Sequence, residues 1–234
     1  MNKTPFVSKT YFKDAERVQN EIWKDIDVRD KTVIDVGIGE STEKLVELGA
    51  KVIGVDNDFR KIMSYRKSGI PLILCDFINF PFHRRIADIV VFYFTLHEIC
   101  PCHHHRALIT ARKIAPTVII VEPSSHGCLA YREFARLWRD AMNSVGKFEE
   151  YMPAEYWEGI VRKAGFDKTL RKTVKWKAEV PIEVLGNIIT ATINEWKDMG
   201  VGEYYIKKLQ EFLKENPRLT WSNIEVIIGK SLDV

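Results

Sequence analysis

The stretch Val33-Ile-Asp-Val-Gly-Ile-Gly-Glu-Ser-Thr42 decides the fold of this chain. It reads as a buried strand that runs through two glycines into the start of a helix. Glycines after a strand permit a tight turn and a close approach of backbone to ligand, and a helix N-terminus favours an anion. The stretch therefore predicts a ligand-binding strand, turn and helix.

This turn departs from the dinucleotide fingerprint G-x-G-x-x-G. Gly37 and Gly39 match the first two glycines, but Thr42 stands in the third position. Asp35 also lies two residues before the first glycine, where a pyrophosphate would gain nothing from a carboxylate. The pattern indicates a cationic ligand rather than a nicotinamide dinucleotide.

Further short runs rich in Val and Ile follow without alternation of polar residues, which is typical of parallel strands buried on both faces. With the first run, they span 32–36, 51–55, 71–74, 89–94 and 118–121. Helical patterns over 42–49, 58–67 and 103–114 separate them. This alternation predicts right-handed βαβ units in a doubly wound α/β sheet.

The flanks predict mostly helices within a single domain spanning 1–234. Residues 1–30 should form an N-terminal helical cap (helix over 12–28), 31–123 the cofactor-binding core, and 178–219 a helical lid inserted before the last strand. The remaining patterns predict helices over 129–145, 154–164, 182–198 and 204–215, and strands over 168–177 and 223–228.

Composition places the chain among ordinary globular proteins. It has 234 residues, 29% charged and 46% hydrophobic, with a net charge of +3, which is too mild to indicate nucleic-acid binding. No apolar run approaches the roughly 20 residues of a membrane helix. The few, irregularly spaced cysteines favour a cytoplasmic location. Glutamine occurs only at positions 19 and 210, which hints at a thermophilic source.

The glycine turn resembles the first motif, D-x-G-x-G-x, of class I S-adenosylmethionine-dependent methyltransferases. That cofactor carries a sulfonium and an ammonium but no phosphate, so the resemblance gives Asp35, Gly37 and Gly39 a role in binding it. The family usually has glycine where this chain has Ser41.

Further motifs follow in the family's order. Asp56 ends the second strand, where the family binds both ribose hydroxyls, and Asn57 follows at the adenine edge. Asp76 and Phe77 follow the third strand, where the family binds the adenine amino group and covers the ring. The resemblance implies a Rossmann-like seven-stranded sheet, mostly parallel with an antiparallel last strand.

The residues around the fourth strand resemble one subgroup of this family. Phe80-Pro-Phe82 and the run from 87 to 99 resemble the L-P-F … F-D-x-V … L-H-x-I pattern of small-molecule enzymes, similar to ubiquinone and trans-aconitate methyltransferases. The resemblance also counts Phe92 and Tyr93 among the cofactor-binding residues. Residues 118–123 resemble the family's fifth-strand motif.

His97 is the candidate catalytic base. The resemblance places it, with Glu98, just past the fourth strand near the methyl acceptor. A neutral histidine suits proton removal from an oxygen or nitrogen acceptor, whereas an ionised carboxylate needs no base. The alternative is a histidine that only packs and hydrogen-bonds in the loop.

The acceptor is the least determined part of the function. Family members that methylate base amines carry N/D-P-P-Y/F, whereas this chain reads Tyr93-Phe94-Thr95-Leu96. We therefore expect a small-molecule acceptor, with a protein or RNA methyltransferase as the alternative. A nicotinamide oxidoreductase and a cofactor-binding module without transfer activity stay open, and the oligomeric state is not indicated.

The stretch Cys100-Pro-Cys-His-His-His105 suggests zinc by its residue types. Successive residues of a helix point about 100° apart, so three adjacent histidines do not share one ion. We expect no metal here, and a place on the surface or beside the acceptor pocket stays open.

Overall fold

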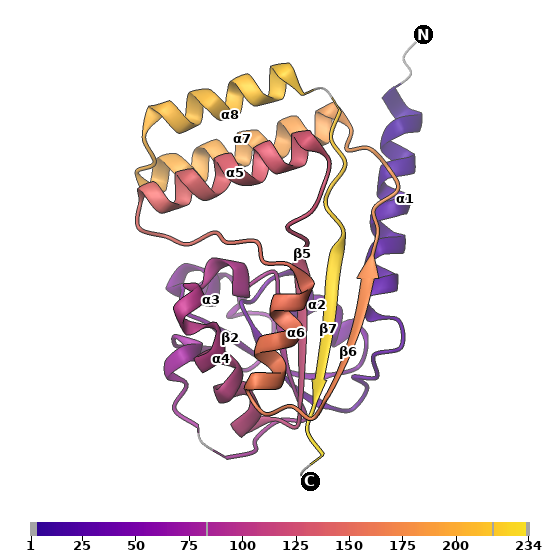
Figure 1. Ribbon diagram of the computed structural model, residues 1–234, viewed down its shortest axis with the longest axis vertical. Coiled ribbons are helices and arrows are strands. Elements are labelled where there is room, and N and C mark those ends of the chain that lie inside the picture. The colour runs from indigo at the N-terminus through magenta and orange to yellow at the C-terminus, as the bar shows by residue number, and fades with distance from the viewer. Residues whose placement is uncertain (1–3, 83, 217, 233–234) are drawn as a thin grey trace. The chain divides into compact units, whose positions relative to one another are not determined.

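The computed structural model describes residues 4–82, 84–216 and 218–232, and these contain one seven-stranded sheet (Figure 1). The order of the strands is β3-β2-β1-β4-β5-β7-β6. The strands are β1 Thr32–Val36, β2 Lys51–Asp56, β3 Leu72–Leu74, β4 Ile89–Tyr93, β5 Thr117–Pro123, β6 Lys168–Val174 and β7 Ile224–Lys230. The predicted doubly wound α/β sheet is confirmed.

Five neighbouring strands are parallel. β1 pairs with β2 and β4, β2 pairs with β3, and β4 pairs with β5, all in parallel. Every residue of β4 is buried, as expected for a strand covered on both faces. The arrows of β6 and β7 point in opposite directions (Figure 1), which confirms the antiparallel last strand.

The helices lie close to their expected positions. They are α1 Thr4–Trp23, α2 Glu40–Glu47, α3 Phe59–Tyr65, α4 Pro101–Ile114, α5 Leu129–Ser144, α6 Ala154–Lys163, α7 Ile182–Met199 and α8 Glu203–Glu215, with short 3-10 helices η1 Phe77–Asn79 and η2 Leu96–Glu98. None of these described helices is both long and apolar enough to span a membrane.

The predicted bounds of the first helix, 12–28, are wrong at both ends. The helix already includes Thr4, the first described residue. It stops at Trp23 because Asp25 adopts a left-handed conformation with φ 68°.

The chain folds into two compact units, each assembled from three separate segments. The sheet unit comprises residues 25–122, 152–173 and 225–232. The helical unit comprises residues 4–24, 123–151 and 174–224. The expected cap and lid segments therefore fall largely within one unit, together with α5.

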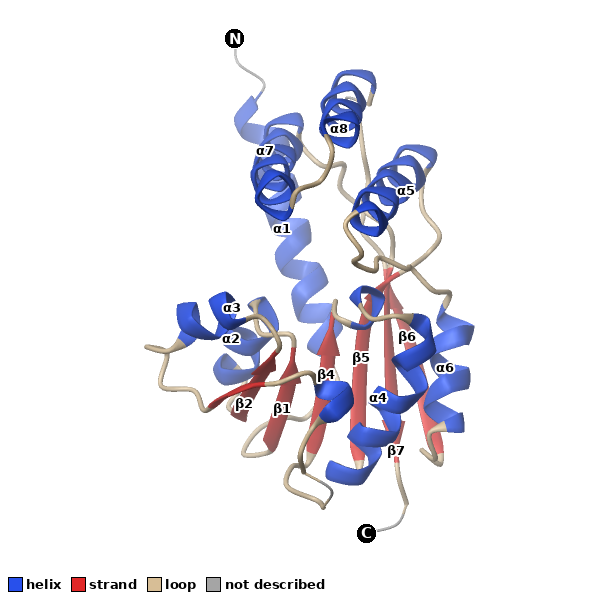
Figure 2. Ribbon diagram, turned by 90° about the vertical axis from the view of Figure 1, so that its left-hand side faces the viewer, coloured by secondary structure: helices blue, strands red, loops and turns tan. Residues whose placement is uncertain are grey.

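The sheet unit has a core of aliphatic and aromatic side chains. The helices α4 and α6 lie side by side against one face of the sheet (Figure 2). Phe92 from β4, Leu108 from α4 and Trp157 from α6 are fully buried in this layer. Burial of such side chains stabilises the unit by about 1.5–3 kcal/mol each.

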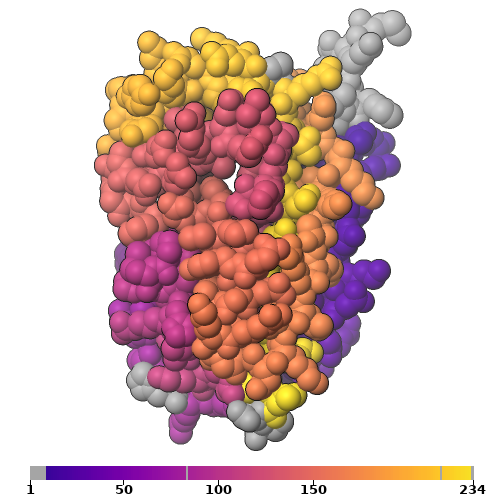
Figure 3. All heavy atoms as spheres, viewed as in Figure 1, coloured from indigo at the N-terminus to yellow at the C-terminus, as the bar shows by residue number. Residues whose placement is uncertain are grey.

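The helical unit has an aromatic core. Helices α5, α7 and α8 run together, and atoms of α5 and α8 lie next to one another on the face seen in Figure 3. Phe134 of α5 contacts the rings of Trp138, Phe212 and Trp221, and Trp138 packs edge-to-face on Trp196 of α7.

Candidate functional site

The order of the strands places a switch point between β1 and β4. From β1 the chain winds outward through β2 and β3, and it then returns to β4 on the other side. In open α/β sheets the crevice at such a point, outside the carboxyl ends of the strands, is where ligands bind. The turns after β1, β2 and β4 meet at this edge.

Gly37 fills a position that only glycine tolerates. Its φ is +82°, and an added β-carbon would lie 2.4 Å from Thr95 Oγ1 in the turn after β4. Thr95 Oγ1 in turn lies 2.8 Å from the carbonyl oxygen of Val36 and 2.9 Å from that of Tyr93, so its hydroxyl donates to one of them. The turns after β1 and β4 therefore touch, and a side chain at Gly37 would separate them.

Gly39 differs from Gly37, because nothing in the described residues fills the position of its missing β-carbon. Its φ is 174°, which any residue adopts, and an added β-carbon would meet no atom within 4 Å. The protein's own packing therefore does not require glycine there. The open space suits the close approach of a ligand.

Asp35 is a buried carboxyl group held by hydroxyls. Thr42 Oγ1 lies 2.6 Å and Ser41 Oγ 2.9 Å from its Oδ2, and both donate to it. Burial raises the pKa of Asp35 to about 7, Asp56 adds to the rise, and the two hydroxyls oppose it. Ser41, which replaces the glycine expected from the resemblance, thus serves as a donor to Asp35.

The raised pKa of Asp35 predicts a pH-dependent stability. The folded pKa lies above the unfolded value of 3.8, so the folded state binds the extra proton between these values. The contribution of Asp35 to the free energy of unfolding is fully present below pH 3.8. It is lost as the pH rises through 7, which lowers the free energy of unfolding by up to about 4 kcal/mol.

We expect Asp35→Asn, which removes the charge, to gain stability relative to the wild type between pH 5 and pH 8 in urea unfolding. Asp88→Asn, at the opposite edge of the sheet, should instead follow the wild type. Parallel curves for wild type and Asp35→Asn would show that Asp35 titrates near its ordinary pKa.

Asp56 ends β2 with its carboxylate at the same edge. Its Oδ2 accepts from the backbone N–H of Ile38 at 3.1 Å, and its Oδ1 accepts from that of Asp58 at 2.8 Å. A carboxylate offers about four acceptor positions, so each oxygen retains one. Asn57, the next residue, is exposed.

Asp76 and Phe77 lie at the end of β3. Asp76 caps η1 by accepting from the N–H of Ile78 at 3.0 Å. Phe77 and Phe92, for which the sequence predicts cofactor contacts, pack edge-to-face with ring centroids 5.3 Å apart and are buried. The reason is that the turn of η1 directs Phe77 inward, onto β4. Tyr93 is also largely buried, beside Phe94.

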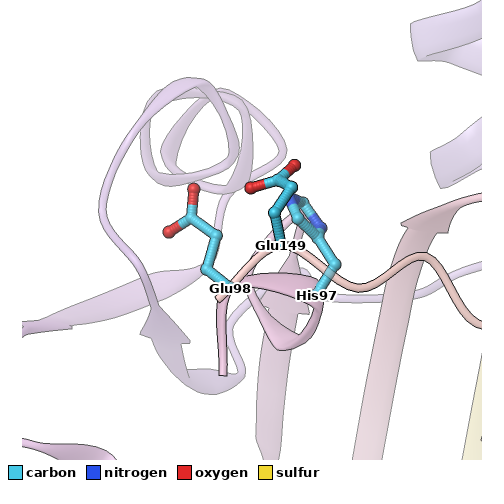
Figure 4. Close-up of side chains that lie close together, drawn as sticks. All are labelled: His97, Glu98 and Glu149. Atoms are coloured by element: carbon cyan, nitrogen blue, oxygen red, sulfur yellow. The ribbon is translucent and has the colours of Figure 1, made fainter. Parts of the chain in front are cut away.

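His97 stands on η2, the turn after β4, and is largely buried. Its Nδ1 lies 2.5 Å from Oε2 of Glu122, at the end of β5. Oε1 of the same carboxylate accepts from the backbone N–H groups of Thr95 at 3.0 Å and Leu96 at 2.7 Å. Figure 4 shows the side chains of His97 and Glu98, which both rise from this turn.

His104 fixes the other side of this turn. Its Nε2 lies 2.8 Å from the carbonyl oxygen of Leu96 and 2.9 Å from that of Ile99. Two carbonyls can only accept, so Nε2 carries the proton, and Nδ1 accepts from the Tyr156 hydroxyl at 3.0 Å. Burial lowers the pKa of His104, which keeps the ring neutral.

The role of the stretch from Cys100 to His105 is therefore partly structural. Its middle histidine is buried under η2, while His103 and His105 are exposed on α4. The structure pairs Cys100 with Cys102 in a disulfide, which the expectation of a reducing compartment does not predict.

Comparisons with known proteins give the fold. No family model and no curated protein matches this chain. Among solved structures, an S-adenosylmethionine-dependent methyltransferase from Archaeoglobus fulgidus matches with a TM-score of 0.61 at 14% identity, covering 98% of this chain and 100% of its own. The chain has the methyltransferase fold.

Two further structures with the methyltransferase fold show its range. One from Thermotoga maritima, described as a possible histamine N-methyltransferase, matches with a TM-score of 0.58 at 16% identity, covering 96% of this chain and 95% of its own. The cyclopropane synthase MmaA2 from Mycobacterium tuberculosis matches with 0.61 at 15%, covering 92% and 84%. Identities this low establish the fold alone.

Glu122 is the residue of this methyltransferase fold that sequence reasoning missed. A glutamate that closes the buried run of β5 is a weak signal, but a carboxylate in such a position needs a partner. Its partner, His97, lies 25 residues earlier, so only the fold reveals the pair.

Proposed function

We propose that this protein is an S-adenosylmethionine-dependent methyltransferase that acts on a small molecule. The observation that carries the proposal is the carboxyl edge of the sheet at the switch point. There, the turn that contains Gly39 follows β1, and open space lies beside this glycine. The neighbouring strand β4 leads to His97, which is buried against Glu122. The fold of the matching methyltransferases supports it.

The residues at this edge fit the cofactor. The open space at Gly39 admits a close ligand, and the unused acceptor positions of Asp56 suit a pair of ribose hydroxyls. Asp35, although it accepts from two hydroxyls, would offer its carboxyl group to the cationic part of the cofactor. We assign cofactor binding to the residues that the sequence predicts for it. They are Asp35, Gly37, Gly39, Asp56, Asn57, Asp76, Phe77, Phe92 and Tyr93.

The catalytic part of the proposal rests on His97. When bound, S-adenosylmethionine supplies a methyl group that is already activated, so the protein must mainly orient the acceptor and exclude water. An acceptor hydroxyl or amine also has to lose a proton, and His97 is the base that we assign to it. Its fixed place on η2 supports this assignment.

A small molecule is the acceptor that we favour. One structure with this fold is described as a possible histamine N-methyltransferase. The subgroup of the ubiquinone and trans-aconitate enzymes, a cytoplasmic location and a thermophilic source belong to the same proposal and rest on sequence alone. A protein or RNA methyltransferase is the second candidate, and a steep salt dependence of acceptor binding would favour it.

Calorimetry tests the cofactor first. We expect the wild type to bind S-adenosylmethionine and S-adenosylhomocysteine. In Asp56→Ala the affinity should fall roughly ten- to a hundredfold, since removing the ribose acceptor costs about 1.5–3 kcal/mol.

The matched control is Asp88→Ala. Asp88 accepts from the N–H of Thr32 at the amino edge of the same sheet, so its loss should leave the affinity unchanged. Absence of binding to the wild type would overturn the proposal, and nicotinamide dinucleotides would be tested next.

A further inference from the structure

We propose that Glu122 sets the tautomer of His97, so that the neutral ring carries its proton on Nδ1 and its lone pair on Nε2. Glu122 is then a positioning residue, which acts on the acceptor only through the imidazole. The role of His97 as a base rests on the proposed function, whereas the tautomer rests on geometry alone.

The hydrogen-bond inventory of Glu122 carries the argument. Its side chain is 1% exposed, so the protein supplies its partners. Oε1 already accepts two backbone N–H groups, those of Thr95 and Leu96, and Oε2 offers a further acceptor position. An ionised carboxylate has no proton to donate. At 2.5 Å from Oε2, Nδ1 of His97 must therefore be the donor.

The same carboxylate also holds the turn that presents the ring. Its bonds to Thr95 and Leu96 tie the start of η2 to the end of β5, while His104 holds the carbonyls of Leu96 and Ile99 from α4. Position and protonation of His97 are thus fixed together. A histidine that merely filled space would need neither arrangement.

This assignment narrows the class of acceptor. A ring with its lone pair on Nε2 serves an acceptor that gives up a proton, that is, a hydroxyl or an amine. An ionised carboxylate acceptor would make no use of it. We therefore infer that the acceptor group of the substrate is an O–H or N–H group.

The substitution Glu122→Gln tests the tautomer because glutamine keeps the shape but offers one acceptor oxygen. Two backbone N–H groups need that oxygen, so the amide NH2 turns toward Nδ1 of His97. A donor facing Nδ1 moves the ring proton to Nε2. We expect the tautomer to reverse and methyl transfer to fall about 10²–10⁴-fold, as for other bases in the wrong tautomer.

Long-range ¹H–¹⁵N NMR of protein labelled at histidine gives the readout without any acceptor. Spectra are recorded at rising pH until the His97 ring is neutral, and the signals missing in His97→Gln identify that ring. We expect Nδ1 protonated in the wild type and Nε2 protonated in Glu122→Gln. The control is Glu225→Gln, a similarly buried strand carboxylate that bonds to Thr173 and should leave the His97 tautomer unchanged.

Either of two results would overturn the inference: a wild-type ring protonated on Nε2, or an unchanged tautomer in Glu122→Gln. The wild-type spectrum decides even if that variant does not fold. Calorimetry separates the two proposals, since Glu122→Gln should bind S-adenosylmethionine like the wild type. If the wild type did not bind S-adenosylmethionine, the proposed function would be refuted, but the assignment of the His97 tautomer would not be affected.

Discussion

Gly37→Ala is expected to destabilise the protein by about 1.5–3.5 kcal/mol. Alanine at φ +82° costs about 1–2 kcal/mol, and the displaced Thr95 hydroxyl loses a hydrogen bond worth about 0.5–1.5 kcal/mol. Urea unfolding followed by circular dichroism measures the change. Thr95 anchors the turn that carries His97, so we also expect weakened activity in the folded fraction.

Gly39→Ala is the matched control, because the two glycines lie in the same turn. Its backbone is extended and the new methyl group meets no atom within 4 Å, so the stability should be unchanged or slightly raised. Affinity for S-adenosylmethionine should nevertheless fall at least about tenfold, because the methyl group fills the space assigned to the cofactor. Wild-type affinity in this variant would show that the cofactor does not approach Gly39.

His97→Gln is expected to lower kcat about 10²–10⁴-fold while the dissociation constant of S-adenosylmethionine stays the same. Glutamine keeps a polar side chain near Glu122 but has no group that accepts a proton near neutral pH. Turnover is measured with acceptors found by screening phenols, amines and carboxylates. Retained activity on a carboxylate alone would show that the reaction needs no base.

His105→Gln is the control for this substitution. His105 is an exposed histidine on α4, and its ring contact is to the carbonyl of Lys163 at 3.3 Å. We expect wild-type kcat from this variant. If both variants lost activity equally, the effect would not be specific to the ring held by Glu122.

The sheet could be predicted because its strands are short, apolar and bounded by turns. In β1 and β4, burial on both faces leaves an unmistakable run of Val and Ile. The same feature hides the direction of each side chain, since a run without alternation does not say which face of the sheet a residue occupies. The run around Phe92 therefore does not predict where its ring points, and the structure places it in the core.

The residues at the carboxyl edge of the sheet could be predicted from the sequence, whereas the hydrogen-bond partners that hold η2 could not. Glycines and strand-end carboxylates follow one another at fixed spacing, so Asp35, Gly37 and Asp56 stand out. The partners of His97 and His104 lie 25 and 52 residues away, and only tertiary packing brings them together. No local pattern distinguishes His104 from the two exposed histidines beside it.

The place of β7 in the sheet has a consequence for biosynthesis. It is the last described strand along the chain, yet it lies between β5 and β6. While the ribosome is still working, β6 has no neighbour to pair with, and the exposed edge of β5 is open to strands of other chains. Nascent protein therefore stays vulnerable to aggregation until β7 has been released, and loss of β7 would leave β6 without a partner and β5 with one unpaired edge.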